Sequence, residues 1–191
     1  MRELENYAHM HKIPIMNQEG IVFLISYIKE NNIKSILEIG SAIGYSAIKM
    51  ALVSEDIKIT SIERDYELYE LALANVEKYK LAKQIELING DALEVDIIGK
   101  YDLIFIDAAK SKYIDFFERY KKNLVPNGRV ISDNLSFHGM VENPTMTKNK
   151  NTKQLINKIK KYIDFLHDNS EFDTTFYDIG DGISVSIKKG S

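Results

Sequence analysis

Short apolar segments alternate with helix-like segments along most of this chain, and that alternation restricts the fold more than any other feature. Apolar residues at helical spacing, or runs rich in alanine and leucine, predict helices, while short apolar runs predict strands. The predicted strands are residues 35–39, 58–63, 84–88, 101–106 and 129–132, and the predicted helices are residues 17–31, 44–53, 66–79 and 111–123. Strands that alternate with helices form right-handed crossover units, which build a parallel sheet covered on both faces.

The end of the chain departs from this alternation. After a predicted helix at 152–168, strands at 172–177 and 183–188 are separated only by Asp178 to Gly182. So short a connection joins antiparallel strands, because parallel strands need a longer crossover. We therefore predict an α/β fold with a Rossmann-like, doubly wound seven-stranded sheet, mostly parallel with a C-terminal antiparallel hairpin. The polar segment 142–151 is expected to be a mobile loop.

Length and composition exclude several classes of protein. The 191 residues, 45% of them hydrophobic, fit a single domain over residues 1–191. The absence of cysteine excludes disulfides, thiolate zinc sites and a cysteine nucleophile. No apolar run is long enough to span a bilayer and the N-terminus lacks a signal peptide, so we expect a cytoplasmic protein without membrane contact. The net charge of −3 argues against a protein that coats nucleic acid, although it allows a local basic patch.

The end of the first predicted strand has features of a ligand site. Ligands of open α/β sheets bind outside the carboxyl ends of the strands. There, Gly40 and Gly44 flank a tight turn, and small residues let a ligand approach the backbone. The turn lacks the dinucleotide fingerprint because Ala42 stands where a further glycine is expected. Two glycines are also compatible with a simple turn.

The next two strand ends favour a nucleoside-type ligand. Glu63 ends the second strand, 23 residues beyond Gly40, where a carboxylate accepts hydrogen bonds from ribose hydroxyls. Asp91 and Ala92 follow the third strand, beside the expected place of an adenine ring. No cationic group in the glycine turn is available for a pyrophosphate, which favours a cofactor without phosphate over NAD.

An acidic cluster follows the fourth and fifth strands. Asp107 ends the fourth strand, and Asp133 and Asn134 end the fifth. Hard oxygen donors of this kind suit Mg²⁺, and a cation removes the repulsion between close carboxylates. Each aspartate, taken alone, is equally typical of a helix or turn cap. Lys110 lies three residues beyond Asp107, and near a cation it becomes a candidate general base rather than an ordinary surface lysine.

Taken together, these segments resemble a known family. ILEIGSAIGYSAIKMA, ITSIERDYELYELA, INGDAL, YDLIFIDAAKSKY and GRVISDN resemble the metal-dependent O-methyltransferases of the catechol and caffeoyl-CoA type, which use S-adenosylmethionine (SAM). YAHMHKIPIM, SDNLSFHGMV and IGDGISVSIKK resemble most the bacterial tRNA 5-hydroxyuridine methyltransferases within that family. The resemblance covers nearly the whole chain. It implies a homodimer, with an N-terminal helix that is shorter than in many relatives.

The resemblance also implies roles for individual residues. It assigns Mg²⁺ to Asp107, Asp133 and Asn134, and general-base catalysis to Lys110. The residues implied to contact SAM are Met16, Glu38, Gly40, Ser46, Glu63, Asp91, Ala92 and Asp107.

Three hypotheses for function remain open on the sequence. A tRNA wobble-uridine methyltransferase would use a basic rim, which we define as Arg64, Lys112, Lys148, Lys150 and Lys153, to hold anticodon-loop phosphates, with Tyr113 or Phe137 stacking on a base. A catechol-type enzyme would methylate a free small molecule. A non-enzymatic SAM-binding module would carry out no methyl transfer. The lysines are equally typical of a solvated helix face.

Overall fold

A computed structural model describes residues 1–190 of the chain. It contains a seven-stranded sheet in the order β3-β2-β1-β4-β5-β7-β6. The strands are β1 (Ser35–Ile39), β2 (Lys58–Glu63), β3 (Ile85–Asn89), β4 (Tyr101–Ile106), β5 (Leu124–Ser132), β6 (Phe172–Tyr177) and β7 (Ile183–Lys188). The first five strands pair in parallel, and β7 pairs antiparallel with both β5 and β6. The predicted fold class is confirmed, and β6 lies at the edge of the sheet.

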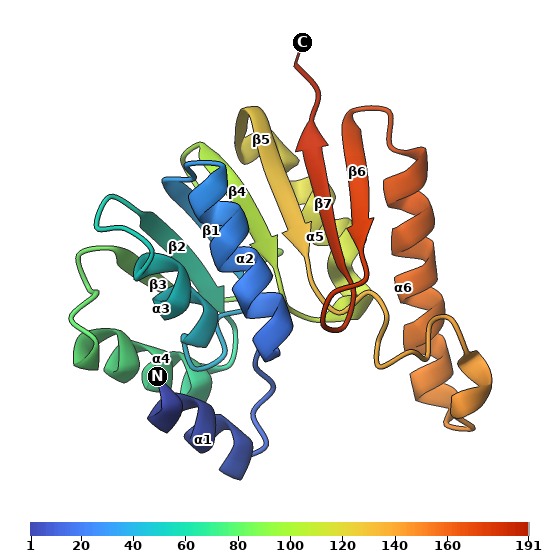
Figure 1. The fold of residues 1–191 in the computed structure, drawn as a ribbon, viewed down its shortest axis with the longest axis horizontal. Coiled ribbons are helices and arrows are strands. Elements are labelled where there is room, and N and C mark those ends of the chain that lie inside the picture. Colours follow the sequence, from blue (N-terminus) through green and yellow to red (C-terminus); the bar gives the residue numbers. More distant parts are fainter. Residues whose placement is uncertain (191) are drawn as a thin grey trace.

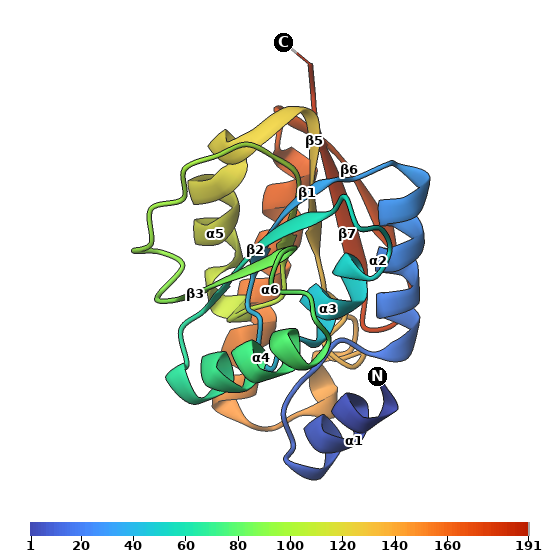
Figure 2. The same ribbon diagram turned by 90° about the vertical axis from the view of Figure 1, so that its left-hand side faces the viewer.

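Helices cover both faces of this sheet (Figures 1 and 2). The helices of one face are α2 (Gln18–Glu30), α3 (Tyr45–Ala51) and α4 (Tyr66–Lys78), and those of the other are α5 (Tyr113–Tyr120) and α6 (Lys150–Asp168). The buried core accordingly has two halves, one on each side of the sheet. Burial on both faces explains why the strands read as continuous apolar runs, as in Leu103 to Ile106.

The N-terminal helix α1 (Arg2–Met10) was implied by the family resemblance but was not predicted from the residue pattern. Only Leu4 and Ala8 of this helix are buried, so it contributes few residues to the core. Polar contacts to distant helices also attach it: Tyr45 Oη donates to Glu5 Oε1 at 2.9 Å, and Lys78 Nζ lies 2.8 Å from Glu3 Oε1. Helix α1 thus sits beside α4 at the edge where the parallel strands end (Figure 2).

Several predicted boundaries differ from the structure. β5 begins five residues before the predicted strand, so the Pro126-Asn127-Gly128 turn lies inside it, where the pairing with β4 is irregular. The predicted helix 111–123 is α5 flanked by two short 3₁₀ turns, η1 (Lys110–Lys112) and η2 (Lys121–Asn123). The segment 142–151 contains a third, η3 (Pro144–Met146), and the start of α6. Among the described residues, no helix has both the length and the apolar content that a membrane crossing requires.

Candidate active site

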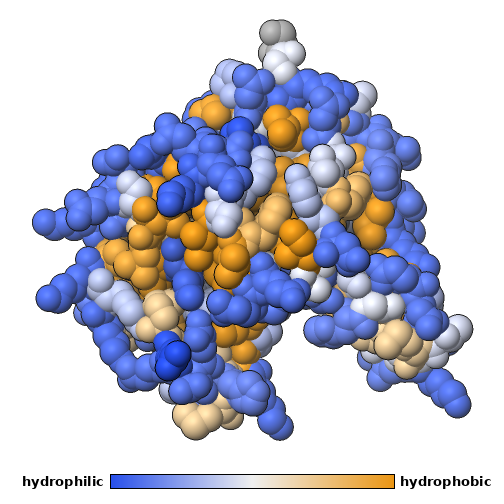
Figure 3. All heavy atoms as spheres, viewed as in Figure 1, coloured by the Kyte–Doolittle hydropathy of each residue, from blue (hydrophilic) through white to orange (hydrophobic). Residues whose placement is uncertain are grey.

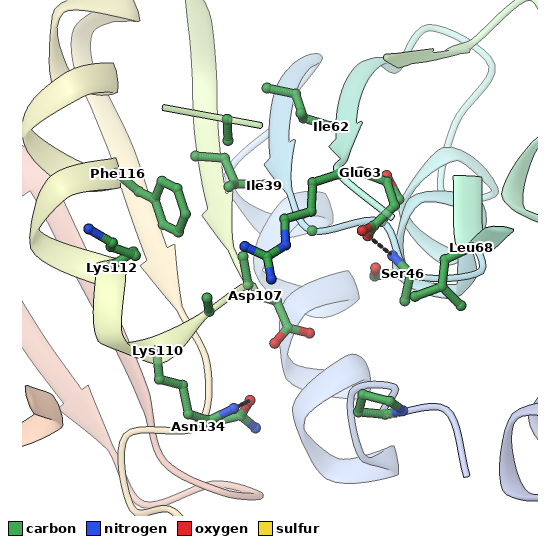
Figure 4. Close-up of a pocket in the computed structure, with 18 of the residues that line it drawn as sticks. Ile39, Ser46, Ile62, Glu63, Leu68, Asp107, Lys110, Lys112, Phe116 and Asn134 are labelled. Carbon is green, nitrogen blue, oxygen red and sulfur yellow. Dashed lines mark hydrogen bonds between the residues drawn. The ribbon is translucent and has the colours of Figure 1, made fainter. Parts of the chain in front are cut away.

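A cavity of about 550 Å³ lies at the carboxyl ends of β1, β2, β3, β4 and β5. One part is lined by the loops after β1, β2 and β3, and another by Lys110 and Asn134 from the loops after β4 and β5. Figure 4 shows Asp107 between these two parts, with Glu63 and Ser46 on one side and Lys110 and Asn134 on the other. Most of the predicted SAM-contacting residues line this cavity: Met16, Gly40, Ser46, Glu63, Asp91, Ala92 and Asp107.

Backbone geometry and Glu63 shape the glycine turn after β1. Gly40 has a φ of +98° and Ala42 a φ of +45°, so the chain turns sharply through left-handed conformations. Glu63 holds the turn, because its Oε2 accepts a hydrogen bond from Ala42 N at 2.8 Å, drawn as a dashed line in Figure 4. Its other oxygen accepts from Asp65 N at 2.9 Å. The carboxylate is thereby fixed at the cavity wall with lone pairs left to accept further hydrogen bonds.

Glu38 lies behind the cavity wall rather than on it. Its side chain is fully buried, and it accepts hydrogen bonds from Ser46 Oγ at 2.5 Å and from Ser61 Oγ. Burial raises the pKa of Glu38 to about 7, and the nearby charges of Asp107 and Glu63 add to the rise. Glu38 does not line the cavity, and each of its oxygens accepts from one serine, so its contact with the cofactor stays a prediction. Glu38 instead orients Ser46, which does line the cavity.

The strand ends bring the predicted acidic cluster together. β4 and β5 are neighbours, and Asp133 N donates to Ile106 O, so Asp107 and Asp133 follow adjacent strands in register. Lys110 Nζ donates to Asn134 Oδ1 at 2.8 Å, and Asn134 Nδ2 donates to Asp133 Oδ2 at 3.2 Å. Burial raises the pKa of both aspartates; the charge of Asp107 raises the pKa of Asp133 further, and Lys110 opposes both shifts.

The same cluster fits a divalent cation in its donor chemistry. Asp133 is fully buried, and its Oδ1 has no hydrogen-bond partner among the described residues. A buried, unpartnered carboxylate oxygen beside a second carboxylate is costly, and a cation would offset both the desolvation and the repulsion. Within residues 1–190 no group of three or more His, Cys, Asp or Glu side chains is arranged to hold a metal. The candidate ligands are therefore two carboxylates and the amide oxygen of Asn134.

A family model described as O-methyltransferase matches residues 1–189. The chain belongs to the O-methyltransferase family. Caffeoyl-CoA O-methyltransferase 1 of Arabidopsis thaliana is 39% identical to it over 157 residues, which are 75% of this chain and 60% of that protein. The chain thus spans less than two thirds of the length of this curated relative.

Solved structures of other proteins share the fold of this family member. A Staphylococcus aureus protein provisionally named as a caffeoyl-CoA O-methyltransferase has a TM-score of 0.93 and 37% identity, covering 98% of this chain and 91% of that one. An O-methyltransferase from Bacillus cereus in complex with SAH has a TM-score of 0.83 at 23% identity, covering 98% and 90%. At the latter identity the likeness concerns the fold alone.

The predicted basic rim of this O-methyltransferase family member divides into two groups. Arg64 and Lys112 line the cavity. Lys148, Lys150 and Lys153 do not line it, but they are exposed at η3 and the start of α6, the corner of the molecule at the same edge of the sheet (Figure 1). The molecule is indented between this corner and the corner formed by α1 (Figure 3).

Two polar residues that were not predicted as site residues, His138 and Asp181, also line the cavity. Asp181 belongs to the turn between β6 and β7, which the sequence marks only as a short glycine-containing connection. Tyr113, considered as a stacking residue, is instead fully buried and donates from its hydroxyl to Asp133 O at 3.0 Å. Its role in this structure is to support the strand end that carries Asp133.

Proposed function

We propose that this protein transfers the methyl group of SAM to a hydroxyl of a small molecule that carries two neighbouring oxygens, as catechols and caffeoyl-CoA do. One observation supports this most strongly: a single cavity joins the turn of Gly40, Ser46 and Glu63 to the pair formed by Lys110 and Asn134. The first group offers sites for a nucleoside, and the second offers a base and oxygen ligands. Donor and acceptor would therefore meet at Asp107.

The residues have distinct parts in this proposed reaction. Glu63 would accept hydrogen bonds from the donor's ribose, and Ala92 would contact its base. Lys110, as the neutral amine, would take the proton of the acceptor hydroxyl. The oxygen then attacks the methyl carbon as the carbon–sulfur bond breaks, giving a methyl ether and S-adenosylhomocysteine (SAH). Holding the two reactants in line in one cavity reduces the entropic part of the barrier.

Asp107, Asp133 and Asn134 are the residues that would hold Mg²⁺. A divalent cation at this site would supply Lewis acidity, which favours the ionised form of a bound hydroxyl. Asn134 Oδ1 accepts a hydrogen bond from Lys110 Nζ. The oxygen proposed as a metal ligand therefore also contacts the proposed base. Tyr113 stabilises these proposed ligands, because its hydroxyl donates a hydrogen bond to the backbone oxygen of Asp133.

The comparisons support the donor and the acceptor class to different degrees. The Bacillus cereus structure contains SAH, the product that SAM leaves after methyl transfer. The Arabidopsis relative at 39% identity is named for caffeoyl-CoA. The chain spans only 60% of that relative, so caffeoyl-CoA is a proposed acceptor for this protein.

The test is a methyl-transfer assay with isotopically labelled SAM and a panel of catechol, caffeoyl-CoA and bulk tRNA. We expect label in the small molecules, loss of transfer on chelation of divalent metal, and recovery with added Mg²⁺. Transfer to none of these acceptors, together with SAM binding that survives Asp133→Ala, would favour a non-enzymatic SAM-binding module. SAM binding itself is measured separately by calorimetry, so the donor and acceptor parts of the proposal can fail independently.

A second candidate acceptor is the 5-hydroxyl of wobble 5-hydroxyuridine in tRNA. The observation that favours it is the position of Lys148, Lys150 and Lys153, which are exposed at or just before the start of α6 and form no ion pair among the described residues. Lysines arranged in this way would contact phosphates of an anticodon loop. Mass spectrometry of tRNA nucleosides tests this: cells without the gene would accumulate 5-hydroxyuridine and lose 5-methoxyuridine.

We also propose that the protein is a homodimer that associates through the face of α2. Val22 is 51% exposed, and on the same element Phe23 and Tyr27 are half-buried, with Phe23 packed against half-buried Tyr177. Figure 3 shows apolar side chains gathered in the middle of this face. Exposed apolar patches of this kind are typical of protein interfaces. Analytical ultracentrifugation tests the proposal: Val22→Asp should shift a dimer towards monomer.

A further inference from the structure

The loop after Asn134 and the turn between β6 and β7 are joined backbone to backbone. Leu135 N donates to Gly182 O at 3.0 Å, and Ser136 N donates to Asp181 O at 2.8 Å. Gly182, with a φ of +83°, is required there, because a Cβ on it would lie 2.7 Å from Ser136 N. We name residues 135–139 the acceptor loop, since they follow Asn134 and lie on the Lys110 side of the cavity.

The side chain of Asp181 is the main polar support of this loop. It is only 7% exposed, and its Oδ1 accepts a hydrogen bond from His138 N. His138 Nδ1 lies 3.6 Å from the same oxygen, while the imidazole itself is largely exposed and lines the cavity. Asp181 Oδ2 is buried and has no hydrogen-bond partner among the described residues. Burying a carboxylate with one unpartnered oxygen costs free energy of folding. Such a group beside a cavity therefore indicates a function.

The acceptor loop needs such a support because its backbone is strained. Phe137 and His138 have φ of +48° and +58°, and Asn134 just before the loop has a φ of +63°. Non-glycine residues are disfavoured in this region, so the conformation persists only where surrounding contacts fix it. The strained geometry places the Phe137 ring 5.8 Å from Lys110 Nζ. The shape of the loop therefore decides what surrounds the proposed base.

We propose that Asp181 is a positioning residue that fixes the acceptor loop and so determines which acceptors fit beside Lys110; this rests on the proposed function above. Asp181 acts through the amide of His138 and the placement of Phe137 and His138. It is not a fourth metal ligand, because the described carboxylates form no metal-holding group of three. The donor contacts lie on the other side of Asp107, so the effect falls on the acceptor.

The test compares Asp181→Ala, Asp181→Asn and the matched control Asp178→Asn, whose aspartate is exposed in the same turn. A hydrogen bond to a charged group is worth about 1.5–3 kcal/mol, so Asp181→Ala should raise the KM for the acceptor about 10- to 100-fold. Asp181→Asn keeps an oxygen that accepts from His138 N and should restore much of the loss. SAM affinity by calorimetry and the kinetics of Asp178→Asn should stay at wild-type values.

Several results would overturn the proposal. An unchanged acceptor KM in Asp181→Ala would do so, as would equal losses of SAM affinity and acceptor affinity. Wild-type protein that binds SAM but methylates no acceptor would refute the proposed function, and hydrogen exchange would then decide the positioning role alone. Exchange of the His138 amide should accelerate in Asp181→Ala and not in Asp178→Asn; equal exchange in all variants would contradict it.

Discussion

Gly40 and Asp107 meet through their backbones at the carboxyl ends of β1 and β4. A Cβ on Gly40 would overlap the Asp107 carbonyl oxygen and lie 2.9 Å from its carbonyl carbon. The donor side and the Lys110 side of the cavity are therefore held against each other through these two residues. This contact explains why a glycine is needed where the sequence alone allowed a simple turn.

Gly40→Ala should destabilise the fold and abolish SAM binding. The new Cβ meets backbone atoms that cannot move independently, and the φ of +98° disfavours alanine, so we expect a loss of about 2–4 kcal/mol in the free energy of unfolding. Gly139→Ala is the control, because Gly139 also has a positive φ but has nothing within 4 Å of a Cβ. Urea unfolding and calorimetry with SAM measure both effects. Equal losses in the two variants would mean that the contact with Asp107 is unimportant.

Lys110→Ala should lower kcat while leaving SAM affinity unchanged. A positioned general base contributes about 10²- to 10⁴-fold, and the lost hydrogen bond to Asn134 lies on the acceptor side of the cavity. Lys122→Ala, at an exposed lysine of η2, is the control. Steady-state kinetics with the acceptor identified in the panel measures the effect. A kcat that stays within a few-fold of wild type would remove Lys110 from the catalytic role.

Asp133→Asn should weaken Mg²⁺ binding and slow methyl transfer together. The substitution keeps the side-chain shape but removes the charge that a cation would balance, and the unpartnered Oδ1 is the atom concerned. Asp164→Asn, at an exposed aspartate of α6, should bind Mg²⁺ as the wild type does. Titration calorimetry with Mg²⁺ gives the affinity. Wild-type protein that binds no Mg²⁺ and works in the presence of a chelator would contradict the metal proposal.

Glu38 should make the protein less stable as pH rises from about 4.5 to 7. Burial raises the pKa of Glu38 to about 7 from a usual 4.5, so in this window the folded chain holds a proton that the unfolded chain has lost. Stability is lost as pH rises through the window and is level above it. The size is about 3 kcal/mol, at 1.36 kcal/mol for each pKa unit.

The difference between wild type and Glu38→Gln isolates this effect from other titrating groups. Urea unfolding of both proteins at several pH values between 5 and 8 should show the wild type losing stability relative to the variant. Asp107 and Asp133, whose pKa values are also raised, are present in both proteins and largely cancel. A difference that does not change with pH would show that the carboxyl of Glu38 titrates at its ordinary value.

The strand ends could be predicted from sequence because the strand patterns are clear and the ends of parallel strands meet at one edge of the sheet. β1, β2 and β4 are strands whose ends bring Gly40, Glu63 and Asp107 to one edge of the sheet. The residue pattern alone did not predict helix α1, because only two of its residues are buried and distant partners such as Tyr45 attach it; the family resemblance implied it.

Asp181 and Glu38 show the same limit within the site. An aspartate in a turn is normally predicted to be exposed to solvent. Asp181 is buried only because two loops far apart in sequence pack together. Glu38 stands at the right position in the strand, yet Ser46 and Ser61 take up its oxygens. Both depend on side-chain packing between separate segments, which sequence spacing does not report.

The basic rim separates the two candidate acceptors. Changing Lys150 and Lys153 to glutamate together should weaken tRNA binding and leave turnover of catechol unchanged, because neither lysine lines the cavity. Each phosphate contact contributes to the salt dependence of binding with a slope of about 0.7–0.9 per contact, so the double variant should also flatten that dependence by roughly two contacts. Lys158→Glu with Lys160→Glu, further along α6, reverses the same charge away from the start of the helix. Filter binding over a range of salt concentrations makes the measurement. Equal effects of the two double variants on tRNA binding would mean that binding depends on net charge alone. The proposed acceptor would then be the small molecule.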